Sequence, residues 1–433
     1  MEWRNWSGLE SSHPDVVARP GDADAVVAAV DRARAGGTTV KMVGTGHSFT
    51  GIATPAHAML RPDRMSGVVA VDRDAMTVTA LAGTPLHALN VELERLGLSL
   101  HNMGDIAEQT LAGAISTGTH GTGGVAAGLS AQVAGLQLVT GTGELLTATA
   151  EENADVLDLA RIGLGALGVL TTITFRVEPL FVLEAHEQPM TWEQALASFD
   201  ELAASNHHLD LYWFPHTDRV LAKQNNRLDA ALDEAEPLSR ARAWFDDELL
   251  ANRAFALLCL GSNQVPGVIP RMNRVTSRLL TERRYSDVAH RVFTSSRTVV
   301  FKEMEYAVPR VAGVAALREA RRAIEDSTWR ISFPVEVRVV PADDVPLSTA
   351  YQRDTVYLAF HTHRDADHTA YFSAMERIML DHGGRPHWGK LHSLGAAELA
   401  DAYPRFGDFL ALRDRLDPDR VFANDHLRRI LGD

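Results

Sequence analysis

The chain has 433 residues, of which 45% are hydrophobic and 23% are charged, as is ordinary for a globular protein. Its 42 basic and 56 acidic residues give a net charge of −14, which argues against a surface that follows nucleic-acid phosphates or binds anionic membranes. This length predicts two or three domains rather than a single core.

A single cysteine, Cys259, excludes an intrachain disulfide and a cysteine-based metal cluster. The first residues show no basic segment followed by an apolar run, so no secretory signal is expected. No stretch of about 18 uninterrupted apolar residues occurs, so no membrane span is expected either. These features favour a cytoplasmic location.

Apolar residues spaced three and four apart predict helices, and alternating apolar residues predict half-buried strands. The first part of the chain is predicted to contain helices over 22–34 and 84–96, and strands over 38–43, 68–72, 76–81, 132–140, 145–149 and 170–177. Two of these strands are expected to form a hairpin across Gly141 to Gly143. Short, hairpin-linked strands mixed with helices favour an α+β fold over a regular βαβ series.

The pattern changes near Pro179, which predicts a domain boundary. Beyond it, helices are predicted over 193–204, 311–325 and 368–381, and strands over 209–214, 298–306, 333–340 and 355–361. The stretch 225–248 is acidic and weakly patterned, and 252–289 predicts no clear element.

A glycine-rich loop, Gly44-Thr45-Gly46-His47-Ser48, follows the first predicted strand. Glycines let the backbone contact a flat or phosphorylated ligand, and successive free N–H groups form an anion-binding nest. The nicotinamide-binding fingerprint is not met, because Phe49 holds the third glycine position and no helix is predicted to follow. A tight turn in which His47 is merely packed remains the alternative.

A second glycine-rich loop spans 116–123 and contains His120. We expect the two loops to clasp one large cofactor, with His47 bonded to it. His120 is the rival nucleophile or ligand. Two histidines in glycine loops could also bind a metal, but no third ligand has suitable spacing, so no metal site is predicted.

Glu336 and Arg338 lie two residues apart in a predicted strand and therefore share one of its faces. Such a pair can accept hydrogen bonds from substrate hydroxyls and donate to substrate oxygens or to an electron-rich ring. An exposed charge pair is the alternative. Downstream, Lys390 could place a cation against an anionic ring, and His361, at a strand end, is a candidate proton acceptor. Either histidine of the pair His361 and His387 could instead be structural.

Together these motifs resemble the aldonolactone oxidoreductases of the vanillyl-alcohol-oxidase type flavoprotein superfamily. Residues 44–49 resemble that family's flavin-attachment loop, and 117–123 its pyrophosphate loop. Its substrate-domain and C-terminal signatures are similar to 210–217, 333–338, 384–390 and 416–424. The similarity runs nearly end to end and is weakest over 224–292.

The resemblance implies a two-domain fold: an FAD-binding domain over 1–179, a substrate domain over 180–384 that caps the flavin ring, and a C-terminal segment, 385–433, that returns to the first domain. It implies FAD as the cofactor, covalently linked through His47 to the flavin 8α carbon. The other cofactor-binding residues that it implies are Gly44, Thr45, Gly46, Ser48, Gly104, Thr117, Gly118, His120, Gly121, Thr122, Gly123 and Val169.

The implied reaction moves a hydride from a hydroxyl-bearing carbon to flavin N5, with molecular oxygen or another acceptor reoxidising the flavin. For an aldono-1,4-lactone such as L-gulono-1,4-lactone the carbon is C2, and the product rearranges to an ene-diol such as ascorbate. Glu336 would hold substrate hydroxyls, Arg338 and Lys390 would stabilise negative charge on the flavin, and His361 would accept the proton.

Two alternatives stay open. A polyol oxidase of the same superfamily, acting on xylitol or sorbitol, shares the Glu-x-Arg and His-Trp-Gly-Lys elements. Ala114, where the polyol enzymes tend to have serine, and the stretch 213–217 favour a lactone. The other alternative is a flavin-binding protein without turnover, which the joint presence of Glu336, Arg338 and Lys390 disfavours.

Overall fold

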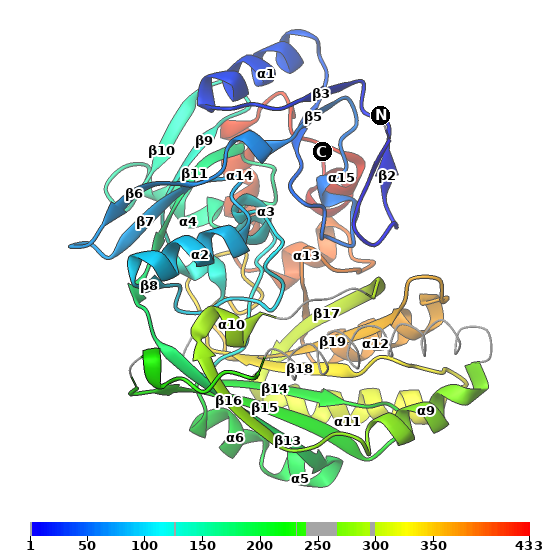
Figure 1. Ribbon diagram of the computed structural model, residues 1–433. Helices are drawn as coiled ribbons and strands as arrows, with labels where there is room; N and C mark the ends of the chain where they lie inside the picture. The colour runs from blue at the N-terminus through cyan, green and yellow to red at the C-terminus, as the bar shows by residue number, and fades with distance from the viewer. Residues whose placement is uncertain (1, 125–126, 231, 240–265, 295–298) are drawn as a thin grey trace.

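The computed structural model describes residues 2–124, 127–230, 232–239, 266–294 and 299–433. Figure 1 shows two regions, one containing the N-terminal part of the chain together with its C-terminal helices, and the other built on a large sheet. Cys259 and the predicted acidic stretch beyond residue 239 lie outside the described residues.

The N-terminal region contains a parallel sheet of three strands and an antiparallel sheet of five. The parallel sheet has the order β3 (Val16–Ala18), β5 (Ala58–Leu60), β4 (Val40–Met42). The antiparallel sheet has the order β10 (Leu145–Ala148), β9 (Val133–Val139), β11 (Val169–Arg176), β7 (Thr77–Leu81), β6 (Val68–Asp72). Two small pairs complete it, β1 (Trp3–Arg4) with β2 (Ser11–Ser12) and β8 (Leu98–Ser99) with β12 (Glu178–Pro179).

The helices of this region are α1 (Ala23–Ala35), α2 (Leu86–Leu96), α3 (Leu111–Ser116) and α4 (Ala154–Ala160). The predicted hairpin between β9 and β10 is confirmed, since the two strands pair in antiparallel register. Helix α2 begins two residues later than predicted, because Pro85 is its N-cap in an extended conformation and has no N–H to give to a preceding turn.

The second region is an eight-stranded sheet in which all neighbouring strands are antiparallel. Its order is β16 (Arg283–Val288), β13 (Val182–Thr191), β15 (Arg219–Leu228), β14 (His208–Trp213), β18 (Val335–Val340), β19 (Thr355–His363), β17 (Phe301–Pro309), β20 (Arg385–Pro386). The helices that the structure describes in this region are α5 (Trp192–Ala197), α6 (Phe199–Ser205), α9 (Ile269–Thr276), α10 (Ala289–Phe293), α11 (Arg310–Glu325) and α12 (Thr369–Asp381). The helix predicted over 193–204 is therefore interrupted, at Ser198.

The two faces of this sheet differ in chemistry. On β18, Val335, Val337 and Val339 belong to the core that the sheet shares with α5, α6, α11 and α12, which lie along one face in Figure 1. Because side chains alternate along a strand, Glu336 and Arg338 point to the opposite face. That face meets the N-terminal region, since Gly123 donates its backbone N–H to the Val339 carbonyl over 2.7 Å. A polar sheet face is thus buried between the two regions.

The C-terminal helices α13 (Ala396–Ala402), α14 (Phe406–Leu416) and α15 (Asp425–Leu431) pack against the N-terminal region (Figure 1). Phe409 and Leu412 share one apolar core with Leu157 of α4, and Asn424 donates from Nδ2 to the Gly51 carbonyl over 2.9 Å. The domain boundaries at residues 179 and 384 stay predictions. Among the described residues, no helix is long and apolar enough to cross a membrane.

Candidate active site

A cavity of about 830 Å³ runs along the first glycine loop, and all five residues from Gly44 to Ser48 line it. The facing wall comes from segments far away in the sequence, including Thr117, Gly165, Val169 and Phe422. The C-terminal tail therefore closes a groove that the N-terminal strands open.

The glycines of this groove are required by their surroundings. A Cβ on Gly44 would lie 2.3 Å from Thr110 Oγ1, which no real contact permits. Gly46 and Gly118 have φ angles of +73° and +74°, a left-handed conformation that glycine adopts without strain. A groove lined by glycine turns, whose N–H groups can face a ligand, fits a large flat cofactor carrying phosphates. The site thus passes a physical test for a dinucleotide such as FAD.

A second cavity, of about 580 Å³, adjoins the first. Residues common to both linings are His47, Ser48, Gln109 and Thr117, so the junction of the two cavities lies at His47. The His47 ring stacks on Trp6 with centroids 5.6 Å apart. Burial lowers the pKa of His47, an effect that Glu108 partly opposes and Lys390 reinforces. The imidazole is therefore neutral near pH 7 and keeps a lone pair for bonding.

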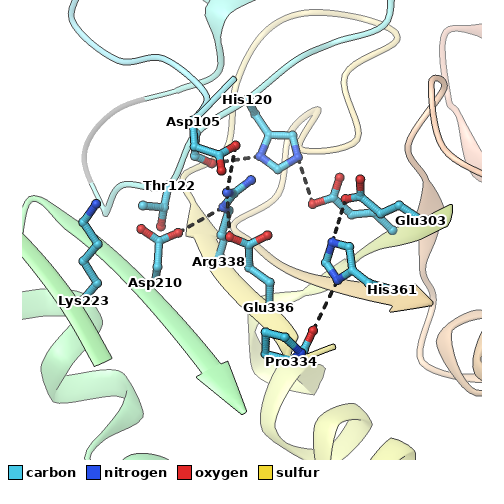
Figure 2. Close-up of polar contacts among 12 residues, drawn as sticks. Asp105, His120, Thr122, Asp210, Lys223, Glu303, Pro334, Glu336, Arg338 and His361 are labelled. Atoms are coloured by element: carbon cyan, nitrogen blue, oxygen red, sulfur yellow. Dashed lines mark hydrogen bonds and ion pairs between the residues drawn. The ribbon is translucent and has the colours of Figure 1, made fainter. Parts of the chain in front are cut away.

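Arg338 is held by three carboxylates on the buried polar face (Figure 2). Its Nη2 donates to Glu336 Oε1 over 2.7 Å and its Nε donates to Asp210 Oδ1 over 3.0 Å, while Asp105 Oδ1 lies 3.6 Å from Nη2. Burial opposes the charge of Arg338, but Glu336, Asp105 and Asp210 outweigh it and raise the pKa of the guanidinium well above its usual value. Glu336 and Arg338 are only 6% and 9% exposed, so the alternative of an exposed charge pair is wrong.

Strand β17 adds two further carboxylates, Glu303 and Glu305, to the same face. Glu303 pairs with Lys390, and its Oε1 lies 3.5 Å from His361 Nε2 on the neighbouring strand. Burial disfavours ionisation of Glu303, but Lys390 and His361 together outweigh it and lower its pKa to about 2. Glu303 is thus a carboxylate that links Lys390 to His361.

Glu305 forms the corresponding pair with His120, whose Nε2 lies 3.4 Å from Glu305 Oε1. The His120 Nδ1 faces the Gly121 carbonyl over 2.8 Å, and a carbonyl can only accept, so Nδ1 carries a proton. His120 also stacks on Tyr357 with ring centroids 3.6 Å apart. Burial opposes ionisation of Glu305, but His120 outweighs it and brings its pKa well below the usual range. Glu305 is therefore a carboxylate that faces the His120 ring.

His387 completes a compact cluster, because one ring nitrogen of His120, one of His387 and a carboxylate oxygen of Glu305 lie within 4.8 Å of one another. Gly389 donates its N–H to His387 Nδ1 over 3.0 Å, which leaves the ring proton on Nε2. Burial lowers the pKa of His387 to about 3, so the ring is neutral and neither nitrogen has a free lone pair. This hydrogen bonding makes the cluster a proton-holding network rather than a ready set of metal ligands.

The structure places the predicted site residues unevenly. The 580 Å³ cavity is lined by five of them: Gly104, Thr117, His120, Arg338 and Lys390. Val169 lines the 830 Å³ cavity together with the first glycine loop. Glu336 and His361 are not among the residues that line either cavity. The Glu336 carboxylate lies behind Arg338, which it contacts, and His361 Nδ1 faces the Pro334 carbonyl over 3.3 Å.

Residues of the second glycine loop line different cavities. Gly121 and Thr122 line a third cavity beyond Arg338, and Thr122 Oγ1 contacts the backbone carbonyls of Leu209 and Val339. Gly118 and Gly123 are not among the lining residues of these three cavities. The assignment of these loop residues to the cofactor stays a prediction.

Three acidic residues of the site, Asp105, Glu303 and Glu305, escaped the sequence analysis, and Asp210 entered it only as the first residue of the signature 210–217. Glu303 and Glu305 had a usable signal, since they repeat the i, i+2 spacing of Glu336 and Arg338 inside a predicted strand. Asp105 gave no signal, because it lies in a loop and meets Arg338 only through the tertiary fold.

Comparison with known proteins agrees with this geometry. Residues 173–430 match the family model described as D-arabinono-1,4-lactone oxidase, and residues 14–149 match that of an FAD binding domain. L-gulono-1,4-lactone dehydrogenase of Mycobacterium tuberculosis (strain ATCC 25618 / H37Rv) is 39% identical over 430 residues, covering 99% of each chain. L-gulonolactone oxidase of Scyliorhinus torazame is 31% identical over 439 residues, covering 99% of this chain and 98% of the relative.

Among solved structures, a variant of cholesterol oxidase from Brevibacterium sterolicum superposes with a TM-score of 0.85 over 99% of this chain and 96% of that one. Its sequence identity is 17%, so the likeness concerns the fold, which is the two-domain vanillyl-alcohol-oxidase type expected from the sequence. Matching family models, relatives aligned over their whole length and a shared fold lead to one conclusion: the chain belongs to the D-arabinono-1,4-lactone oxidase family of FAD-dependent oxidoreductases.

Proposed function

We propose that the protein oxidises an aldono-1,4-lactone at C2, with L-gulono-1,4-lactone as the first candidate. The observation that carries the proposal is the row of buried charges on one sheet face, which borders a cavity that joins the glycine-lined groove at His47. The relatives named for gulonolactone, and the family model named for arabinonolactone, support the choice of substrate class. FAD, when bound, supplies the hydride acceptor.

His47 is the proposed covalent anchor of the cofactor. Its support is positional and electronic: the ring lies where the two cavities meet, and burial keeps it neutral and nucleophilic. The measurement is acid denaturation of the purified protein, after which yellow colour should stay with the polypeptide in the wild type and separate from it in His47→Ala. Complete release of flavin from the wild type would remove His47 as an anchor.

Glu336 is proposed to accept hydrogen bonds from substrate hydroxyls, using lone pairs that Arg338 leaves free. Arg338 and Lys390 bring two cations to the 580 Å³ cavity and would stabilise negative charge that develops there. Their charges are fixed by carboxylate partners, Glu336, Asp210 and Glu303. The cations are therefore oriented before the reaction begins, as electrostatic stabilisation requires.

The hydroxyl proton needs a path to an acceptor, and His361 is the proposed end of that path. Its Nδ1–H is directed at the Pro334 carbonyl, while Nε2 faces Glu303. Because His361 does not line the cavity, Lys390 would take up the hydroxyl proton as it passes one of its own protons to Glu303, and Glu303 would pass that proton to His361 Nε2. The chain of contacts ends on an imidazole whose Nε2 can take up a proton.

Anaerobic mixing of the holoenzyme with L-gulono-1,4-lactone tests the function. We expect the flavin absorbance to bleach with the lactone and to stay unchanged with xylitol and sorbitol. Bleaching by xylitol alone would make the protein an alditol oxidase, and bleaching by none of them would leave a flavin-binding protein without this turnover. Mixing the reduced enzyme with oxygen, and separately with an artificial electron acceptor, then distinguishes an oxidase from a dehydrogenase.

A further inference from the structure

A third cavity, of about 380 Å³, lies next to the cavity that borders His47, with Arg338 between the two. The two cavities meet at Asp105 and Arg338, which line both. In Figure 2, Asp210, Thr122 and Lys223 lie on one side of Arg338, and His120 and Glu303 lie on the other. The remaining lining includes both polar and apolar side chains: Met103, Tyr212, Asn225 and Phe293. The proposed reaction uses none of these four residues.

One acceptor in this cavity has no hydrogen-bond donor. Asn225 is 1% exposed, and its Oδ1 makes no hydrogen bond with any described residue. A buried acceptor left in this state is unfavourable, so such groups are normally satisfied by a ligand or by water. Lys223 lies two residues away on the same strand face and donates to the Val292 carbonyl over 3.1 Å. An ammonium carries three protons, so Lys223 can donate further.

The charges around the cavity balance. Arg338 and Lys223 contribute two cations, and Asp105 and Asp210 contribute two carboxylates. A cavity with no net charge gives no general preference for an anion, but it offers donors and acceptors side by side. Met103 and Phe293 add apolar surface against which C–H groups can pack. This combination suits a neutral polyhydroxylated chain, in which every carbon bears both a C–H and a hydroxyl.

We propose that this cavity binds the exocyclic hydroxyl-bearing chain of the lactone, while the lactone ring lies on the other side of Arg338 and Asp105. A chain hydroxyl donates to Asn225 Oδ1 and accepts from Lys223 Nζ. The inference rests on the proposed function and extends it: the site selects lactones with a hydroxylated side chain over lactones with none. Asn225 and Lys223 are then specificity-determining residues.

The test compares two lactones that have the same ring hydroxyls. L-gulono-1,4-lactone carries an exocyclic diol, and L-erythrono-1,4-lactone, which has the same C2 and C3 configuration, carries no exocyclic chain. For wild type and Asn225→Ala holoenzyme, KM is measured in turnover, and Kd is measured by calorimetry with the dithionite-reduced enzyme, in which no turnover occurs. The matched control is Asn226→Ala, because Asn226 is the next residue on β15 and points to the opposite face.

We expect Asn225→Ala to weaken binding of the six-carbon lactone about tenfold, as the loss of one hydrogen bond would, and to leave binding of erythronolactone unchanged. Asn226→Ala should bind both lactones as the wild type does. Lys223→Met should likewise weaken binding of the six-carbon lactone only. This variant replaces Asn225→Ala in the test if Asn225→Ala does not fold. Equal effects on both lactones, or no effect on either, would overturn the proposal. Absence of flavin reduction by both lactones in the wild type would instead refute the proposed function, and the calorimetric comparison would still decide whether the chain binds here.

Discussion

Asp210 and Arg338 stand directly opposite each other on β14 and β18, and Arg338 Nε donates to Asp210 Oδ1 over 3.0 Å. The carboxylate fixes one edge of the guanidinium, and Glu336 fixes the other. Asp210 and Arg338 are 128 residues apart in sequence, and the pairing of β14 with β18 brings them together. The orientation of the Arg338 guanidinium is therefore set by the register of the sheet. Four predictions follow from this and related contacts.

The first prediction concerns the pH dependence of Arg338 positioning. Burial raises the pKa of Asp210 to about 6, an effect that Arg338 only partly offsets, so the carboxylate is lost as pH falls through 6. The anaerobic flavin reduction rate should therefore decline below pH 6 in the wild type. Asp210→Asn should show the low rate, about tenfold down, at every pH, because a neutral acceptor holds the guanidinium less firmly. If Asp210→Asn keeps the wild-type pH dependence of flavin reduction, Asp210 is not the group that causes the decline below pH 6.

The protonation of Asp210 should also make the free energy of unfolding depend on pH. The folded pKa of Asp210 lies above the usual 3.8, so the folded state binds the proton more tightly. The stabilisation that comes from this tighter proton binding is fully present below pH 3.8 and is lost as pH rises through 6. Urea unfolding should accordingly show Asp210→Asn gaining stability relative to the wild type between these pH values.

The second prediction addresses the buried pair of His120 and Glu305. Removing one partner leaves an uncompensated group in a dry site, which is more destabilising than removing both. A double-mutant cycle with His120→Asn and Glu305→Gln should give a coupling energy of about 1–3 kcal/mol in denaturant unfolding. Additive effects would show that the two side chains, 3.4 Å apart, do not interact as an ion pair.

The third prediction tests the close approach at the first glycine loop. In Gly44→Ala the new Cβ would lie 2.3 Å from Thr110 Oγ1, which caps α3 by accepting from the Gly113 N–H. The loop must shift, at about 1–3 kcal/mol, and the flavin content per polypeptide should fall. Gly21→Ala is the control, because nothing lies within 4 Å of its Cβ. Full flavin content and unchanged thermal unfolding in Gly44→Ala would contradict this account of the loop.

The fourth prediction concerns Lys41, which joins two walls of the cofactor groove. Its Nζ donates to the Gly165 carbonyl over 2.9 Å and to the Phe422 carbonyl over 3.2 Å. Burial lowers the pKa of Lys41 from 10.5 to about 7, with Asp417 partly opposing it. Between these values the unfolded chain binds one more proton than the folded chain, so stability should rise with pH by up to about 1.4 kcal/mol per unit.

The measurement is urea unfolding of the holoprotein at several alkaline pH values. The wild type should show this slope and Lys41→Met should lack it, because methionine has no proton to exchange. Parallel curves for the two proteins would mean that Lys41 is not the group responsible.

Local patterns were sufficient for most secondary structure. The hairpin of β9 and β10 needs only alternating side chains and a glycine turn, and α1 begins at an Asp22 cap that accepts from the Ala25 N–H over 2.8 Å. The interruption of the helix at Ser198 was not predicted. Apolar periodicity continues across it, and no proline or glycine marks the break.

What the sequence determined by itself was the set of local features: the glycines that leave room for a cofactor, and the placement of Glu336 and Arg338 on one strand face, which a period of two imposes. Only the tertiary structure decided that this face is buried and which groups complete it. Strand order brings Asp210 beside Arg338 and Glu303 beside His361, and an independent loop supplies Asp105. The physical reason is that side-chain alternation acts between neighbouring residues, whereas strand pairing and burial depend on how the whole chain packs.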